Sequence, residues 1–79
     1  MKAIVLLRTN PGFGQKAYEK IKTCAKDASG VKIHSLVHCF GRFDGVIVSE
    51  FSDLKKLNVF TEKLRKDGVF QTETLIAVD

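Results

Sequence analysis

Two apolar runs meet at a short corner near the middle of this 79-residue chain, Gly41-Arg42-Phe43-Asp44-Gly45. Glycines at both ends allow backbone conformations that other residues rarely adopt, and the aspartate can accept hydrogen bonds from nearby main-chain N–H groups. Apolar runs separated by four or five such residues are typical of a β-hairpin. The corner therefore predicts an antiparallel pair of strands. Because it also carries an aromatic ring and a carboxylate, it is a candidate recognition loop.

Four segments have the character of β-strands, namely residues 2–8, 31–40, 45–51 and 69–78. The first and the third are apolar at nearly every position, which indicates central strands with both faces covered. The segment 31–40 instead alternates, and strict alternation places Leu36 and Phe40 on the face opposite to Val37.

Two further segments have helical periodicity. Between residues 15 and 27 apolar side chains recur at three- and four-residue spacing, and Ser29-Gly30 ends this helix. The second helix begins after Ser52 or Asp53, either of which is a good N-cap, and ends at Gly68. Its predicted buried stripe is Leu54, Leu57, Phe60 and Leu64.

The predicted order of elements is thus βαββαβ. Right-handed crossovers in both halves give a four-stranded antiparallel sheet of order 4-1-3-2 with two helices on one face. This is the ferredoxin-like sandwich, an α+β fold, and we expect it to form one domain over residues 1–79. The topology places the first and third strands at the centre, where their apolar character also places them.

Helices on one face leave large apolar side chains without cover on the other. The sequence does not show which alternate residues of each strand face the helices. The candidates for the uncovered face are therefore Ile4, Leu6, Leu36, Phe40, Ile47, Ile76 and Val78. An apolar patch of that size usually marks a protein interface. We therefore expect a homodimer that packs its sheets together, and the sequence leaves open whether assembly continues to an octamer or a decamer.

Composition excludes several classes of function. Thirteen basic and nine acidic residues give a net charge of +4, but the lysines alternate with acidic residues, so we expect no direct DNA binding. No apolar run approaches the roughly 18 residues of a membrane span, and no signal peptide is evident, which favours a cytoplasmic protein. No nucleophile–base pair or paired-carboxylate motif is present, so we do not expect an enzyme.

Metal and cofactor sites are not expected either. His34 and His38 share a strand face in strict alternation but lie about 13 Å apart along it, too far to bind one metal ion. Cys24 and Cys39 form no CxxC pair, and we expect both to be buried thiols. Residues 12–14, Gly-Phe-Gly, lack the rest of a dinucleotide or phosphate-loop fingerprint.

From residue 37 to residue 78 the chain resembles the effector-binding RAM domain of the Lrp/AsnC family of amino-acid-responsive regulators. The matching features are the Gly41–Asp44 corner, the apolar strand 46–48, the helix with Leu57 and Leu64, and a closing strand with a Thr-x-Thr motif. The family carries Tyr at the position of Phe43. Its regulators also have an N-terminal helix-turn-helix domain, which is missing here, so the resemblance implies a stand-alone form, with full-length relatives among its candidate partners.

The resemblance implies that a small effector, typically a free amino acid, binds at a subunit interface. Carried over by position, the binding residues are Gly41, Arg42, Phe43, Asp44, Thr72 and Thr74. Main-chain N–H groups of a glycine-bounded turn can hold a carboxylate, and Asp44 can accept from an ammonium group. The two threonines share one strand face, so both hydroxyls can reach one ligand.

Two alternatives remain open at this stage. The ACT domain is another βαββαβ amino-acid sensor, and Asn10-Pro11-Gly12 after the first strand resembles its ligand loop. ACT-type binding would use Asn10 and Gly12 rather than the hairpin corner. The other alternative is a small enzyme of the dimeric α+β barrel kind.

Overall fold

The computed structural model describes residues 1–27 and 30–77. Its elements are β1 (Lys2–Thr9), α1 (Gly14–Asp27), β2 (Val31–His38), β3 (Gly45–Phe51), α2 (Leu54–Arg65), the short 3-10 helix η1 (Lys66–Gly68) and β4 (Phe70–Ala77). The predicted βαββαβ order is confirmed.

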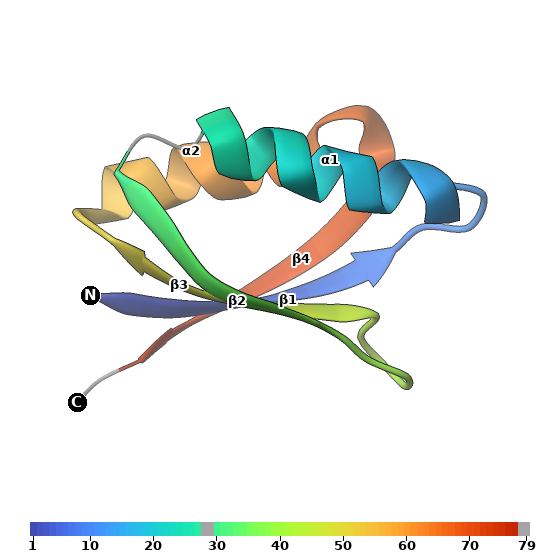
Figure 1. Cartoon of the computed structure of the whole chain (residues 1–79), viewed down its shortest axis with the longest axis horizontal. Helices are drawn as coiled ribbons and strands as arrows, with labels where there is room; N and C mark the ends of the chain where they lie inside the picture. Colours follow the sequence, from blue (N-terminus) through green and yellow to red (C-terminus); the bar gives the residue numbers. More distant parts are fainter. Residues whose placement is uncertain (28–29, 78–79) are drawn as a thin grey trace.

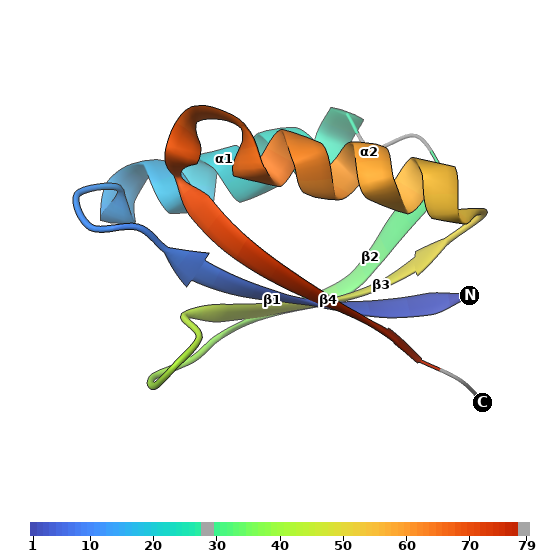
Figure 2. The same ribbon diagram turned by 180° about the vertical axis from the view of Figure 1, so that it is seen from behind.

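The four strands form one sheet of order β2-β3-β1-β4, in which every neighbouring pair is antiparallel. This is the order expected from the sequence, and the ferredoxin-like fold is confirmed. Both helices lie across one face of the sheet and leave the other face uncovered (Figures 1 and 2). Neither helix has the length and apolar character needed to cross a bilayer, as far as the chain is described.

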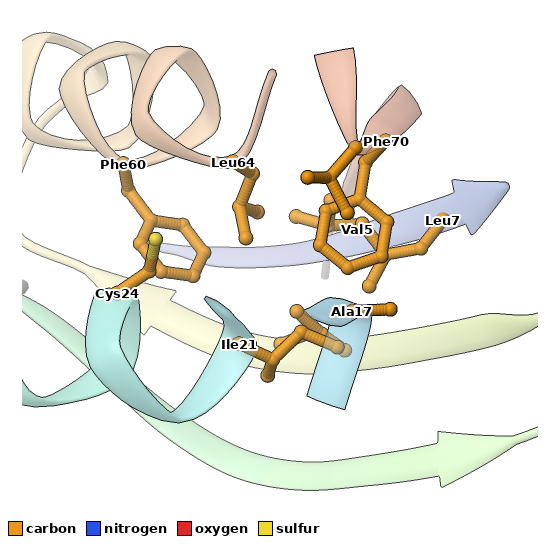
Figure 3. Packing of buried hydrophobic residues seen from close by; sticks show 10 residues of the cluster. Val5, Leu7, Ala17, Ile21, Cys24, Phe60, Leu64 and Phe70 are labelled. Atoms are coloured by element: carbon orange, nitrogen blue, oxygen red, sulfur yellow. The ribbon is translucent and has the colours of Figure 1, made fainter. Parts of the chain in front are cut away.

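The hydrophobic core fills the space between the sheet and the helices. Strand β1 supplies Val5 and Leu7, and α2 supplies Phe60 and Leu64, all at most 1% exposed. Figure 3 shows these side chains packed against Ala17, Ile21 and Cys24 of α1 and against Phe70 of β4. Strand β1 lies in the middle of the sheet, and its odd-numbered side chains from Ala3 to Leu7 are all buried.

The uncovered face of the sheet is apolar over the middle of its two central strands, β1 and β3. The register pairs Leu6 of β1 with Val46 of β3, and Ile4 with Val48, on the face opposite to the buried Val5. Val37 of β2 extends the Leu6 row and Leu75 of β4 extends the Ile4 row, whereas the other ends of the two rows are polar, at Glu73 and Ser35. The resulting surface, here named the open apolar face, consists of Ile4, Leu6, Val37, Val46, Val48 and Leu75.

The prediction that side chains alternate strictly between the two sheet faces along β2 is wrong. The pairing with β3 shifts between Ile33 and Ser35, so that His34 is an extra residue and the later side chains change face. Leu36 therefore packs against the core, whereas Val37 is 50% exposed. The strand also ends at His38 rather than at Phe40.

Other side chains predicted to lack cover have different positions. Ile47 is fully buried because β3 directs its odd-numbered residues towards the helices. Ile76 pairs with the buried Ala3 on the helix side but is 46% exposed, and Phe40 is fully exposed in the β2–β3 loop. Val78 lies outside the described residues.

The predicted helix boundaries are confirmed except at the end of α2, which stops at Arg65 and continues to Gly68 only as the 3-10 helix η1. The Asp53 side chain caps α2 by accepting a hydrogen bond from the Lys56 N–H at 2.9 Å. Gly30 has a φ of +78°, the left-handed conformation expected after a helix, while Ser29 lies outside the described residues. Leu54 is 49% exposed, so the buried stripe of α2 begins one turn later than predicted, at Leu57.

Candidate functional site

The hairpin corner lies against the end of β1. The Asp44 N–H donates to the Leu7 carbonyl oxygen at 2.8 Å, and the Asp44 carbonyl oxygen accepts from the Cys39 N–H at 2.8 Å. These main-chain bonds close the loop between β2 and β3 and attach it to the central strand.

Two side chains strengthen this attachment. The Asp44 carboxylate accepts a hydrogen bond from the Thr9 N–H at 2.7 Å, and Arg8 Nε donates to the Arg42 carbonyl oxygen at 3.1 Å. The Asp44 carboxylate therefore positions the corner on β1. A contact from the same carboxylate to a ligand ammonium group stays a prediction.

Three of the six predicted site residues line one small cavity. Arg42 and Phe43 come from the corner, with the Arg42 guanidinium carbon 5.7 Å from the centre of the Phe43 ring, and Thr72 comes from β4. The cavity has a volume of about 170 Å³, and its other lining residues are Arg8, Gln71 and Glu73. The corner and the closing strand thus meet at one place, as the resemblance implies.

Thr72 and Thr74 lie on the same face of β4, as predicted. The register places them opposite Leu7 and Val5, so this face is the helix-covered one. The Thr72 hydroxyl oxygen is buried and has no hydrogen-bond partner among the residues that the structure describes. A buried hydroxyl without a partner is unusual in native proteins, because losing its hydration costs free energy.

The other three predicted residues lie elsewhere. Asp44 lines a different cavity of about 210 Å³, together with Tyr18 of α1 and His38 of β2. Gly41 and Thr74 line neither of these two cavities. Gly41 has a φ of +124°, which favours glycine in this loop.

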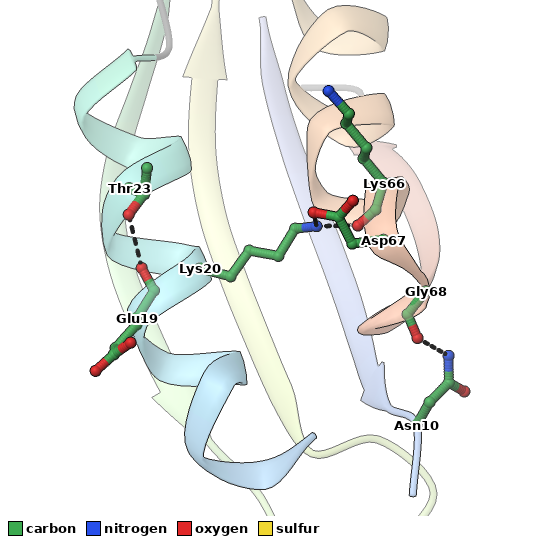
Figure 4. A network of polar contacts seen from close by, with 7 residues as sticks. All are labelled: Asn10, Glu19, Lys20, Thr23, Lys66, Asp67 and Gly68. Atoms are coloured by element: carbon green, nitrogen blue, oxygen red, sulfur yellow. Dashed lines mark hydrogen bonds and ion pairs between the residues drawn. The ribbon is translucent and has the colours of Figure 1, made fainter. Parts of the chain in front are cut away.

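The loop that resembles an ACT ligand loop is held by internal bonds. The Asn10 side-chain amide donates to the Gly68 carbonyl oxygen at 2.7 Å, and the Asn10 N–H donates to the Val69 carbonyl oxygen at 2.9 Å. Figure 4 shows the first of these bonds beside the end of α2. Asn10 thus joins the β1–α1 loop to the start of β4.

Sequence reasoning missed Arg8, Gln71 and Glu73 as lining residues. Their positions follow from the β1–β4 register, which places Arg8 opposite Gln71 and Leu6 opposite Glu73. Alternation along each strand indicates which residues share a face, but it does not indicate which residues of two strands are neighbours.

The histidines do not share a face, in contrast to the prediction, because the bulge at His34 reverses the alternation. His34 Nε2 lies 3.3 Å from a Glu50 carboxylate oxygen, whereas the His38 ring lies 5.9 Å from the Tyr18 ring. Within residues 1–27 and 30–77, no cluster of three or more His, Cys, Asp or Glu side chains could hold a metal ion. Cys39 is only partly buried, so the prediction of a buried thiol is wrong there.

Comparisons with known proteins place this geometry among small regulatory-type domains. No family model and no curated protein matches the sequence. Among solved structures, FFRP-DM1, a feast/famine regulatory protein of Lrp/AsnC-like type, has a TM-score of 0.73 and 29% identity, over 98% of this chain and 97% of that chain. TTHA0845 from Thermus thermophilus has a TM-score of 0.72 and 28% identity, over 99% and 92% of the two chains.

A third structure, the hypothetical protein PHS023 from Pyrococcus horikoshii, has a TM-score of 0.67 and 32% identity, over 98% of this chain and 88% of that chain. These likenesses span nearly the whole length of all four proteins and suggest a small regulatory ferredoxin-like domain. The chain belongs to the same family of ferredoxin-like domains as the Pyrococcus horikoshii protein.

Proposed function

We propose that this chain is an effector-binding and oligomerisation domain of the Lrp/AsnC (RAM) type, which senses a free amino acid at a subunit interface. The observation that carries the proposal is the cavity in which Arg42 and Phe43 of the corner meet Thr72 of the closing strand. The likeness to FFRP-DM1 over almost the full length of both chains supports it.

The interface in this proposal is the open apolar face. Two copies packed through it would remove both rows of apolar side chains from water, which is the main favourable term in protein association. Arg8 and Glu73 lie on the same side of the sheet as this face and also line the cavity. The cavity therefore lies at the border of the proposed homodimer interface, where a second subunit can close it.

The site residues take different roles in this proposal. Arg42, Phe43 and Thr72 line the cavity and contact the effector. The Thr72 hydroxyl is buried on the helix-covered face of β4, so it stays out of that contact. Asp44 holds the corner in place, and Gly41 gives the loop its shape. Thr74 follows Thr72 on the same helix-covered strand face and lines neither cavity, so a contact between Thr74 and the ligand stays a prediction.

We further propose a binding module rather than an enzyme, and one that does not bind DNA by itself but acts with full-length Lrp/AsnC relatives. ACT-type binding at Asn10 and Gly12 is less favoured. The Asn10 amide already donates to the Gly68 carbonyl oxygen, so binding there would first break a bond that joins two segments of the fold.

A thermal-shift panel of the twenty amino acids tests the proposal. Ligand at about one hundred times its dissociation constant stabilises the folded state by roughly 2.7 kcal/mol per site. For a domain of this size each kcal/mol corresponds to about 4–8 °C in Tm. We expect a small subset of amino acids to raise the Tm clearly. A flat panel at millimolar ligand would contradict the proposed function.

A further inference from the structure

The residues that line the cavity at the corner carry a net positive charge. Arg8, Arg42 and Glu73 line it, and none of the three takes part in an ion pair of the described residues. Two guanidinium groups and one carboxylate leave a formal charge of +1. Such a lining favours a ligand that brings a carboxylate of its own.

Arg8 is held in place while most of its donors remain available. Its Nε donates to the Arg42 carbonyl oxygen at 3.1 Å. A guanidinium has five N–H donors in a planar fork, so four remain, and this geometry matches the two oxygens of a carboxylate. The Arg42 guanidinium, in contrast, lies over the Phe43 ring.

Glu73 is placed to complement Arg8. The β1–β4 register pairs Leu6 with Glu73 and Arg8 with Gln71, so Arg8 and Glu73 are diagonal neighbours on one face of the sheet. Diagonal neighbours of an antiparallel pair have Cα atoms about 7–8 Å apart, within reach of long side chains. A group bound between them meets a cation at one end and an anion at the other.

We infer that Arg8 binds the α-carboxylate of the effector and that Glu73 accepts from its α-ammonium group. The inference rests on the proposed function and deepens it, because it assigns the charged ends of the ligand to residues of β1 and β4. Asp44, whose carboxylate accepts the Thr9 N–H, is then a positioning residue for the corner.

The size of the cavity agrees with this assignment. Its volume of about 170 Å³ is several times the space that one water molecule needs. That is enough for the charged head of an amino acid and a small side chain. A longer side chain extends past Phe43 towards the second subunit, so the partner copy contributes to selection among amino acids.

Titration calorimetry with three probes tests the inference. The probes are the amino acid with the largest thermal shift, its primary amide, and its deamino acid, so that each analogue lacks one charged end. Wild-type protein is expected to bind both analogues at least about tenfold more weakly, because each loses a charge-assisted hydrogen bond. Glu73→Gln is expected to weaken the binding of the amino acid about tenfold and to leave the affinity for the deamino acid unchanged.

Arg8→Gln is expected to weaken the binding of the amino acid and of the deamino acid by a similar factor, and to leave the affinity for the amide unchanged. Glu62→Gln and Arg65→Gln on the surface of α2 are matched controls, which should leave all three affinities unchanged. Asp44→Asn should preserve the wild-type ratio between the affinities for the amino acid and the deamino acid.

The inference is overturned if Glu73→Gln keeps the wild-type ratio of the affinities for the amino acid and the deamino acid. It is also overturned if Asp44→Asn brings that ratio to one. Either result would leave the proposed function intact, since wild-type protein still binds an amino acid. If no amino acid binds the wild-type protein, the proposed function and the inference are both rejected. Matching amide spectra of each variant and the wild type exclude misfolding as the cause of a lost response.

Discussion

The carboxylate of Asp44 accepts a hydrogen bond from the main-chain N–H of Thr9, 35 residues earlier in the sequence, at 2.7 Å. This bond joins the loop between β2 and β3 to the end of β1. The sequence predicts that Asp44 accepts hydrogen bonds from main-chain N–H groups of its own turn. In the structure the Asp44 carboxylate also holds the corner in place against β1.

Asp44→Ala is therefore expected to lower the free energy of unfolding by about 1 kcal/mol, because the Thr9 N–H loses its charged acceptor. In this small domain that corresponds to a fall in Tm of about 4–8 °C, measurable by calorimetry. Glu62→Ala, which removes an exposed carboxylate from α2, is the control and should change stability by less than about 0.5 kcal/mol. Equal effects of the two substitutions would show that the Asp44 bond does not hold the corner.

Lys20 is expected to stabilise the end of α2. Its side chain is only 13% exposed, and its ammonium group donates to the Lys66 carbonyl oxygen and lies 3.5 Å from the Asp67 carboxylate (Figure 4). Carbonyl groups at a helix end lack partners within the helix, and a cation there is favourable. Lys20→Met keeps the buried stem and should cost about 1 kcal/mol in chemical denaturation, whereas Lys55→Met should cost almost nothing. Equal denaturation midpoints for both variants would contradict this role.

Two neighbouring residues of α2 should differ sharply on truncation. Phe60 is 1% exposed in the core, and Val59 is 47% exposed. Phe60→Ala should cost about 3–5 kcal/mol, which is most of the stability expected for a small domain, while Val59→Ala should have little effect. Circular dichroism during thermal unfolding would measure both, and similar melting curves would contradict the placement of α2.

These residues also show how far the sequence determines the fold. The apolar character of β1 and β3, the periodicity of α2 and the Asp53 cap suffice to predict the element order and the strand order. The bulge at His34 could not be predicted, because an extra residue on one strand becomes visible only when its partner strand is in place. The error at Leu36 follows from that single residue.

The candidate site was only partly predictable for a related reason. Arg42 and Phe43 carry a recognisable motif within one loop, so they could be identified from the sequence. Arg8 and Glu73 belong to different strands, and only the register shows that they line the same cavity. A motif identifies residues that are close in sequence, whereas a site assembled across a sheet depends on pairing.

The open apolar face should control assembly. Val48→Lys introduces a charge into the middle of this face, where burial against a second copy would leave the ammonium group without water or a partner. We expect wild-type protein to have at least twice the 8.8 kDa mass of one chain by light scattering, and Val48→Lys to be monomeric. Val59→Lys on the helix side is the control and should assemble like wild type. A wild-type monomer at micromolar concentration would contradict the proposed interface.

The measurement that tests the central claim most directly is the titration of backbone amide signals by NMR with the amino acid selected in the thermal-shift panel. Effector binding at the corner predicts the largest shifts in residues 41–44 and 71–74, with small shifts at Asn10 and Gly12. ACT-type binding would reverse this pattern, with the largest shifts in residues 10–14 and little change at the corner, and that result would contradict the account.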